Sequence, residues 1–120
     1  MKYTTYVTGT INISNVSPFN KIQIKQILSE IYSQKEIENI YSDNLIDINV
    51  EWNEFNDSEK FLIVMYKISK LLPSDTKALI ICNGEREYDI WGIIIQNNKV
   101  FTQKFDLVPI EELKEYKSKK

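Results

Sequence analysis

The sequence contains no histidine and only one cysteine, and these two scarcities exclude much of the chemistry that side chains can perform. Without histidine the chain cannot build a Ser-His-Asp or Cys-His nucleophile, a His-ligated zinc site or imidazole acid–base catalysis. A single cysteine cannot form an intramolecular disulfide, which argues against a disulfide-stabilised secreted fold. Cys82 sits in the apolar run KALIICN, so we expect an inert core thiol rather than a nucleophile.

Long apolar runs and a strong net charge are missing as well. No stretch approaches the ~18 apolar residues of a membrane span, and the first residues lack the apolar segment of a secretion signal. We therefore expect a cytoplasmic protein without a membrane partner. The net charge of −2 gives no basic field that would attract nucleic acid. Calcium-loop and phosphate-loop spacings are absent from the sequence, so we expect no metal and no cofactor.

The residues that are present describe an ordinary globular chain. At 120 residues, with 42% hydrophobic and 27% charged residues, the sequence predicts one domain over residues 1–120. Ile, Lys and Asn occur 19, 14 and 11 times, whereas Ala and Arg occur once each. Because codons for Ile, Lys and Asn are AT-rich, this bias indicates an origin in a low-GC bacterium or its phage.

Alternating patterns predict five strands. Residues 3–13 have β-branched side chains at period two, and Gly9 in their middle indicates a bulge or a close backbone approach. Residues 45–53 alternate strictly, with one apolar and one polar face, which is typical of a sheet covered on one side. A meander of three strands follows within residues 77–108, and Asn97 and Asn98 supply a hairpin turn.

Helical periodicity predicts two main helices. The first covers about residues 18–33, with Ser17 as N-cap and Pro18 in the first turn. The second follows Asp57 and ends at Pro73. A further helical turn is expected around residues 35–41. A short helix is expected to begin at Pro109, and residues 114–120 to form a frayed basic tail.

The order β-α-β-α-β-β-β predicts an α+β two-layer sandwich. Two helices with one apolar stripe each need a sheet face on which to bury it, so we expect both on the same side of a mixed sheet of about five strands. Ferredoxin-like folds are the nearest common architecture. Right-handed crossovers would place the first two strands parallel to each other.

Carboxylates along two predicted strands provide a candidate binding surface. Alternation places Asp47 and Glu51 on the polar face of one strand. If Asp89 and Trp91 share that face, an acidic and aromatic surface results, suited to a partner with a basic surface. The alternative is an ordinary solvated sheet face, and a tryptophan beside an aspartate is more often part of a core.

The strand around Trp91 carries isoleucines on both faces. It should therefore be central, or its second face should be covered by the C-terminal helix or by a partner chain. The same region argues against nucleic acid as a partner. Tyr3, Tyr6, Phe101 and Phe105 could stack on bases, but they lack the neighbouring basic residues of an RNA-binding sheet.

Two segments resemble a known group of proteins. YTTYVTGTINI (residues 3–13) and DIWGIIIQNNKV (residues 89–100) are similar to parts of a family of uncharacterised phage-associated proteins. Members open with a strand containing Val-Thr-Gly and close with an acidic-Trp strand and a hairpin. The resemblance implies a phage or plasmid context, where small acidic proteins often inhibit host defence, as anti-CRISPR proteins do. It assigns a role to no residue.

Together these features predict a non-enzymatic protein-binding module, a monomer or homodimer that inhibits a host defence complex. The expected partner is a host or defence-system protein with a basic surface. The predicted contact residues are Asp47, Glu51, Asp89 and Trp91, and no catalytic or metal-binding residue is expected. A toxin-immunity or regulatory protein, a small carboxylate-only enzyme and a structural phage protein remain alternatives.

Overall fold

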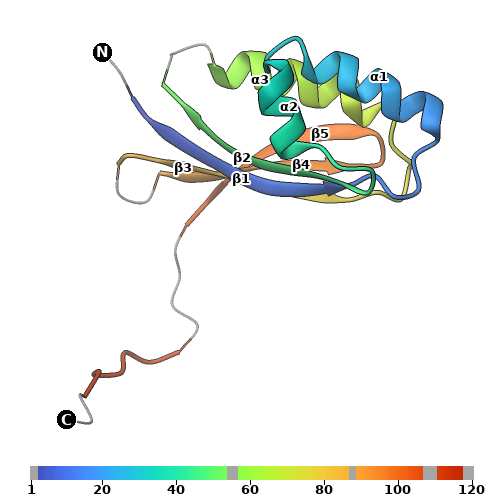
Figure 1. Ribbon diagram of the computed structural model, residues 1–120. Coiled ribbons are helices and arrows are strands. Elements are labelled where there is room, and N and C mark those ends of the chain that lie inside the picture. Colours follow the sequence, from blue (N-terminus) through green and yellow to red (C-terminus); the bar gives the residue numbers. More distant parts are fainter. Residues whose placement is uncertain (1–2, 54–56, 87–88, 107–110, 118–120) are drawn as a thin grey trace.

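Five antiparallel strands form one open sheet, and three helices cover one of its faces (Figure 1). The structure is a computed structural model and describes residues 3–53, 57–86, 89–106 and 111–117. Its elements are β1 (Thr5–Asn12), α1 (Pro18–Leu28), α2 (Gln34–Ile40), β2 (Leu45–Trp52), α3 (Asp57–Ser69), β3 (Ala78–Gly84), β4 (Ile90–Gln96) and β5 (Lys99–Phe105). The predicted two-layer α+β sandwich is confirmed.

The sheet has the strand order β2-β1-β3-β4-β5, and every neighbouring pair is antiparallel. The expected parallel pairing of the first two strands, and with it the mixed sheet, was wrong. The reason lies in the chain between them. One long helix would have carried the chain to the far end of the sheet, whereas α1 and α2 lead out and back, so that β2 starts where β1 ends, with Asn12 opposite Leu45.

The predicted helix over residues 18–33 is therefore shorter than expected, and a second helix follows it. Ser17 caps α1 as predicted, through a hydrogen bond that its hydroxyl accepts from the backbone N–H of Asn20. At Ser33 a new cap begins: its hydroxyl accepts from the N–H of Glu36, whose carboxylate accepts from the N–H of Ser33. This capping box starts α2, which includes the further turn expected near residues 35–41.

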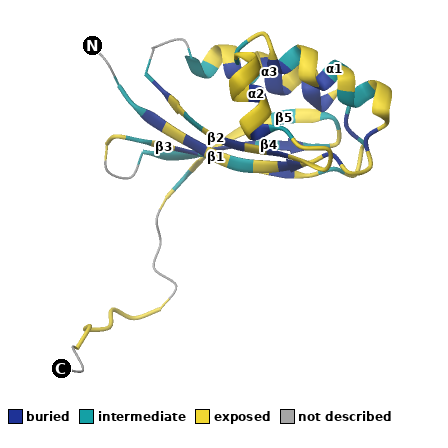
Figure 2. Cartoon of the chain, in the orientation of Figure 1, coloured by how far each residue is buried: buried dark blue, intermediate teal, exposed yellow. Residues whose placement is uncertain are grey.

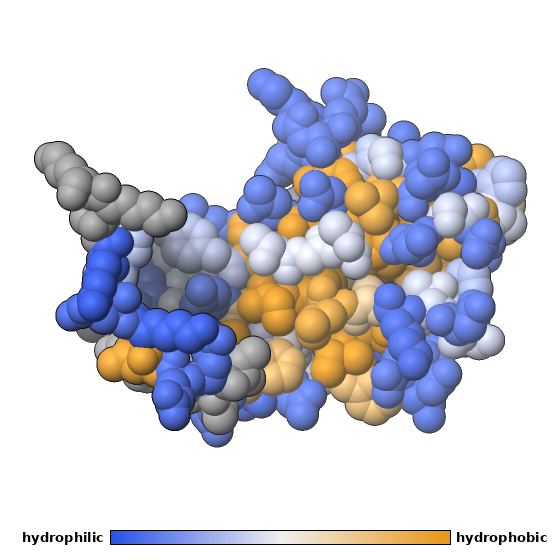
Figure 3. Space-filling model, turned by 90° about the horizontal axis from the view of Figure 1, so that it is seen from below, coloured by the Kyte–Doolittle hydropathy of each residue, from blue (hydrophilic) through white to orange (hydrophobic). Residues whose placement is uncertain are grey.

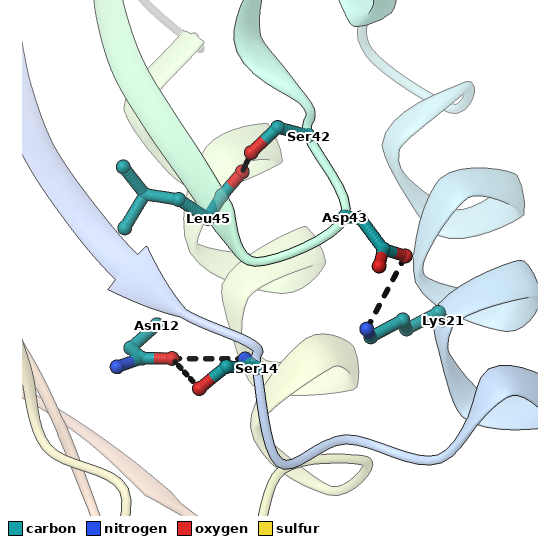
Figure 4. A network of polar contacts seen from close by, with 6 residues as sticks. All are labelled: Asn12, Ser14, Lys21, Ser42, Asp43 and Leu45. Carbon is teal, nitrogen blue, oxygen red and sulfur yellow. Dashed lines mark hydrogen bonds and ion pairs between the residues drawn. The ribbon is translucent and has the colours of Figure 1, made fainter.

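A network of polar contacts fixes the corner where the chain enters and leaves this helix pair (Figure 4). The Asn12 carbonyl oxygen Oδ1 accepts from both the N–H and the hydroxyl of Ser14. Nearby, Lys21 Nζ of α1 lies 3.3 Å from Asp43 Oδ1, just before β2. The first contact shapes the turn after β1, and the second joins α1 to the loop before β2. The end of β1 is joined to the start of β2 by the backbone N–H of Ile13, which donates to the carbonyl oxygen of Asn44 at 2.9 Å.

The core lies between the sheet and the helices (Figure 2). Strand alternation supplies its floor, and the apolar stripes of α1 and α3 supply its roof. Fully buried side chains from the two layers include Val7, Ile11, Ile24, Leu28, Ile46, Ile48, Phe61, Met65, Ile68, Ile80, Ile93 and Ile95. Gly9 makes the predicted close approach, because a Cβ there would lie 2.6 Å from the Leu79 carbonyl oxygen.

The β4–β5 hairpin turn also caps the C-terminal end of α3. Asn97 and Asn98 adopt the positive φ angles predicted for this turn, 53° and 60°. In addition, Asn98 Nδ2 donates hydrogen bonds to the carbonyl oxygens of Ser69, at 2.9 Å, and Leu72, at 2.7 Å. Ser69 is the last residue of α3, and the other donor to its carbonyl oxygen, the N–H of Leu72, is 3.4 Å away, so the Asn98 amide supplies the shorter hydrogen bond at this helix end.

Beyond β5 the structure departs from the sequence-based expectation. Pro109, the expected first residue of a C-terminal helix, lies outside the described residues, as do Tyr88 and Leu107 of the predicted meander. Residues 111–117 contain no helix, and Leu113 and Tyr116 are almost completely exposed. A helix this short is marginal in water without a surface on which to pack its apolar side.

Replacing Asn98 with Gly should lower the free energy of unfolding by about 1–3 kcal/mol, because two hydrogen bonds of about 0.5–1.5 kcal/mol each are lost. Glycine preserves the positive φ, so the backbone is not strained by the change. The matched control is Asn97→Gly, which changes the neighbouring turn residue and should be nearly neutral. Urea unfolding monitored by circular dichroism compares the two variants; equal losses would contradict the capping role of Asn98.

Candidate protein-binding surface

The sheet face opposite the helices, called here the open face, is covered by no element among the described residues. Its side chains form rows that cross the strands, because directly opposed residues on one face are neighbours about 4.5–5.5 Å apart. One row contains Glu51, Tyr6, Asn83, Ile90 and Phe105, and another contains Asn49, Thr8, Ile81, Gly92 and Gln103. A third joins Leu79, Ile94 and Phe101. The open face therefore changes in character from β2 to β5.

The β3–β5 half of the open face is apolar. We call the following set the apolar strip: Leu79, Ile81, Ile90, Ile94, Phe101 and Phe105. Leu79 and Phe101 are 48% and 44% exposed, although each has an isoleucine beside it, and the other four are half-buried. Figure 3 shows apolar side chains gathered over the middle of this face. A contiguous apolar patch of this kind on a water-exposed face is typical of an interaction site.

Gly92 allows the apolar strip to be continuous. A Cβ at this position would lie 2.6 Å from Cε2 of Phe105 and 3.1 Å from Cδ1 of Leu79. The Phe105 ring thus lies against the backbone of β4 and closes the gap between β3 and β5. Any larger residue at position 92 would push the ring off the sheet.

The β2–β1 half of the open face is polar and acidic. Asp47 and Glu51 point to this side from β2, as the sequence predicted, and both are exposed. Their neighbours on β1 are Thr10 and Tyr6, and the Tyr6 ring is 55% exposed. Two carboxylates thus lie beside an exposed aromatic ring and one strand away from the apolar strip.

Trp91 does not join Asp47 and Glu51 on this surface. It lies on the helix-covered face, because Ile93 and Ile95 are buried there and alternation carries Trp91 to the same side. Its ring centroid is 5.9 Å from that of Trp52, which in turn packs 5.3 Å from Phe61. The alternative interpretation, a tryptophan packed in the core layer, describes its position.

Asp89, just before β4, holds neighbouring segments together through its contacts. Its carboxylate accepts a hydrogen bond from the Tyr3 hydroxyl and lies 3.5 Å from Lys104 Nζ. Its backbone carbonyl accepts from the N–H of Gly84 across the hairpin, at 2.8 Å. The hydrogen bond to Asp89 raises the pKa of the Tyr3 phenol above its usual value of 10.0. Asp89 and Trp91 border a hollow of about 570 Å³ beside Leu62 of α3, on the side away from Asp47 and Glu51.

Sequence reasoning missed the apolar strip itself. The isoleucines on both faces of β4 carry the signal, because they predict either a central strand or a strand whose second face is covered by the C-terminal helix or a partner chain. β4 does lie between β3 and β5, but the described residues leave its second face uncovered. The alternative of a central strand is therefore confirmed, and cover by a partner chain stays a prediction.

A cavity of about 430 Å³ contains several carboxylates, which bears on the carboxylate-only enzyme. It lies between β2, α2 and the start of α3, and Glu30, Glu36, Glu51 and Asp57 border it. Three of these have structural partners: Glu30 lies 2.8 Å from Lys67 Nζ, Glu36 closes the capping box, and Asp57 accepts from the N–H of Asn53. The cavity therefore does not present the pair of uncommitted carboxylates that acid–base hydrolysis needs.

The remaining reactive groups are buried. Cys82 is completely enclosed on the helix-covered face, and burial raises the pKa of its thiol from 9.0 to about 12. Burial also raises the pKa of Tyr32 above 10.0. Among the described residues, no group of three or more Cys, Asp or Glu side chains is placed to hold a metal ion. In the same part of the chain, no helix is long and apolar enough to cross a membrane.

Comparisons with protein-family models, with curated proteins and with solved structures found no match for this chain.

The buried thiol predicts a loss of stability at alkaline pH. Above pH 9 the unfolded chain loses the Cys82 proton, whereas the folded chain keeps it up to a pKa of about 12. The unfolded state then binds fewer protons, so the free energy of unfolding should fall between pH 9 and 12, by up to about 1.4 kcal/mol per pH unit for this group. Urea unfolding at several pH values measures the slope. In Cys82→Ala the slope should be shallower by that amount, and an unchanged slope would contradict the account.

Proposed function

We propose that this protein is a non-enzymatic binding module that docks a partner protein on its open face. The observation that carries the proposal is the apolar strip, which lies on the β3–β5 half of the open face, one strand away from Asp47 and Glu51. A matching partner has an apolar centre and a basic rim on the side that meets β2. Burial of the strip would supply affinity, and the two carboxylates would set orientation and speed association.

The size of the open face fits such an interface. Five strands at about 4.8 Å spacing and seven or eight residues at about 3.3 Å rise cover an area on the order of 500–600 Å² before side-chain relief is counted. A standard protein–protein interface buries about 800 Å² on each partner. One partner that covers the sheet and part of its rim would reach that value.

The proposal that the protein is not an enzyme is supported by its side chains. The sequence has no histidine, Cys82 is enclosed, and three of the four carboxylates that border the cavity between β2, α2 and α3 have structural partners. The open face itself presents apolar, hydroxyl and amide groups, with two separated carboxylates on β2 and Lys99 at the start of β5. This combination suits recognition of a surface better than activation of a substrate.

Within this class we propose an inhibitor of a host defence complex, such as an anti-CRISPR protein. The support for this finer proposal is the resemblance of residues 3–13 and 89–100 to phage-associated proteins and the composition typical of a low-GC genome. A toxin-immunity protein would use the same surface against a basic toxin. The identity of the partner separates the two.

The first test compares variants of the two sides of the molecule in a pull-down from lysate of a low-GC bacterium, analysed by mass spectrometry. Leu79→Gln/Phe101→Gln should reduce recovery of the partner at least tenfold. Both side chains are about half exposed, so binding would bury the other half, and each substitution loses roughly half of the ~1.5–3 kcal/mol that full burial contributes. Glu51→Lys should reduce recovery at low salt more than at high salt. The matched control is Ile63→Gln, which changes an equally exposed residue on α3.

The expected result is a protein retained by the wild type and by Ile63→Gln but lost with the open-face variants, while melting temperatures stay within a few degrees. A defence-complex subunit would support the inhibitor, and a toxin would support the immunity protein. A partner retained by the open-face variants and lost with Ile63→Gln would place binding on the helices and refute the proposed surface.

A further inference from the structure

Residues 111–117 lie apart from the body of the protein, on the side of the open face (Figure 1). In Figure 1 they lie below the sheet, whereas the three helices lie above it. Leu113 and Tyr116, with 101% and 90% of their surface exposed, have no apolar contact in this position. The chain therefore holds two unsatisfied apolar elements on the same side of the sheet, the apolar strip and this tail segment.

If residues 111–117 form a helix, the side chains that could pack on the apolar strip and reach its acidic end lie on one side of that helix. At 3.6 residues per turn, Leu113, Tyr116 and Lys117 fall within an arc of about 100°. Glu111 and Glu115 fall on the opposite side of the same helix. Packing Leu113 and Tyr116 on the apolar strip would thus direct Lys117 along the sheet and keep Glu111 and Glu115 in water. The third glutamate, Glu112, falls about 40° outside the arc, beside Tyr116.

Acidic residues lie across the sheet from the point where the tail begins. Phe105, where the tail leaves β5, belongs to the row that continues through Ile90, Asn83 and Tyr6 to Glu51. Crossing from β5 to β2 spans four strand spacings, about 19 Å. The five residues between Phe105 and residue 111, at about 3.3 Å each, followed by a helix that rises about 1.5 Å per residue, allow Lys117 to lie up to about 27 Å from Phe105. The tail is long enough to place Lys117 at Glu51 or Asp47.

We propose that residues 111–117 fold back onto the open face as a short helix, with Leu113 and Tyr116 on the apolar strip and Lys117 at the acidic end. The segment has the chemistry of the proposed partner, an apolar centre with a basic group toward β2. Docking also supplies the packing surface that the C-terminal helix predicted from the sequence lacks in the extended position.

The docked tail would regulate the open face, and this consequence rests on the proposed function. A segment attached next to its own site competes at an effective concentration in the millimolar range. If nine tenths of the molecules have the tail docked, the apparent affinity for a partner falls about tenfold. Displacement of the tail would then be a part of partner binding.

The docking itself can be tested without any partner, so that its failure and the failure of the proposed function are separable. Glu115→Cys, on the solvent side of the proposed helix, is labelled with a nitroxide in the full chain; the native Cys82 is enclosed and does not react. Methyl NMR then measures paramagnetic relaxation of Leu79, Ile81 and Ile94 on the open face, with Ile80 and Ile93 on the covered face as internal references.

The expected result is relaxation of the open-face methyls severalfold above that of the references. Leu113→Ser in the labelled chain should abolish the difference. Lys117→Glu should lower the docked-to-free ratio about two- to fivefold, as loss of an exposed ion pair predicts. Lys114→Glu, which changes a lysine outside the docking arc, is the matched control and should lower the ratio less than Lys117→Glu does, because it removes only the exposed ion pair of Lys114 with Glu111, 3.6 Å apart.

Two results would overturn the proposal. Relaxation that is equal on both faces, and insensitive to Leu113→Ser, would mean that the tail does not settle on the open face. Relaxation of the open face that appears only when labelled chain is mixed with isotopically enriched, unlabelled chain would mean that the tail docks on a second copy instead.

Discussion

The structure depends on the burial of one face of one sheet beneath three helices. The apolar stripes of α1 and α3 pack on the alternating residues of β1 to β4, with Ile11, Ile48, Ile80 and Ile93 fully enclosed, and Val100 of β5 is partly buried at the edge of this core. Because a strand turns successive side chains to opposite faces, each residue placed in this core forces its neighbour onto the other side. The composition of the open face is therefore tied to the register that builds the core.

That coupling explains why the open face has two characters. On β2 the residues between the core positions are Asp47, Asn49 and Glu51, which are satisfied by water. On β4 the corresponding residues are Ile90, Gly92 and Ile94, which offer water no hydrogen-bonding side chain. A sheet with no need of a second cover would be polar across its full width, as β2 is. The change from polar to apolar across five strands indicates that something other than water meets the β3–β5 half.

Much of the fold followed from residue patterns because the signals were local. Caps at Ser17, alternation around Ile48 and the paired asparagines of the hairpin each act within a few residues. The direction of β2 could not be predicted in that way, because it depends on a chain reversal at Ser33 that splits one apparent helix into two. The second function of Asn98, capping α3 from a distant hairpin, was invisible for the same reason: it joins residues that meet only in the fold.

The candidate site shows the same limit. Asp47 and Glu51 were placed correctly by alternation, which is a property of one strand. Whether Trp91 shares their face depends on which side of β4 the helices cover. The sequence of β4 does not decide this, because isoleucines lie on both of its faces. The apolar strip was present in the sequence as those isoleucines, but only the pairing of Leu79, Ile94 and Phe101 across three strands makes it a surface.

The central claim is that water reaches the apolar strip when the tail is not on it. Relaxation of methyl groups by a soluble paramagnetic agent tests this directly in the full chain carrying Leu113→Ser/Tyr116→Ser. The account predicts strong relaxation of Leu79 and Ile94 and weak relaxation of Ile80 and Ile93, their neighbours on the covered face. Equal protection of all four would mean that the open face is closed in solution, and it would contradict the account.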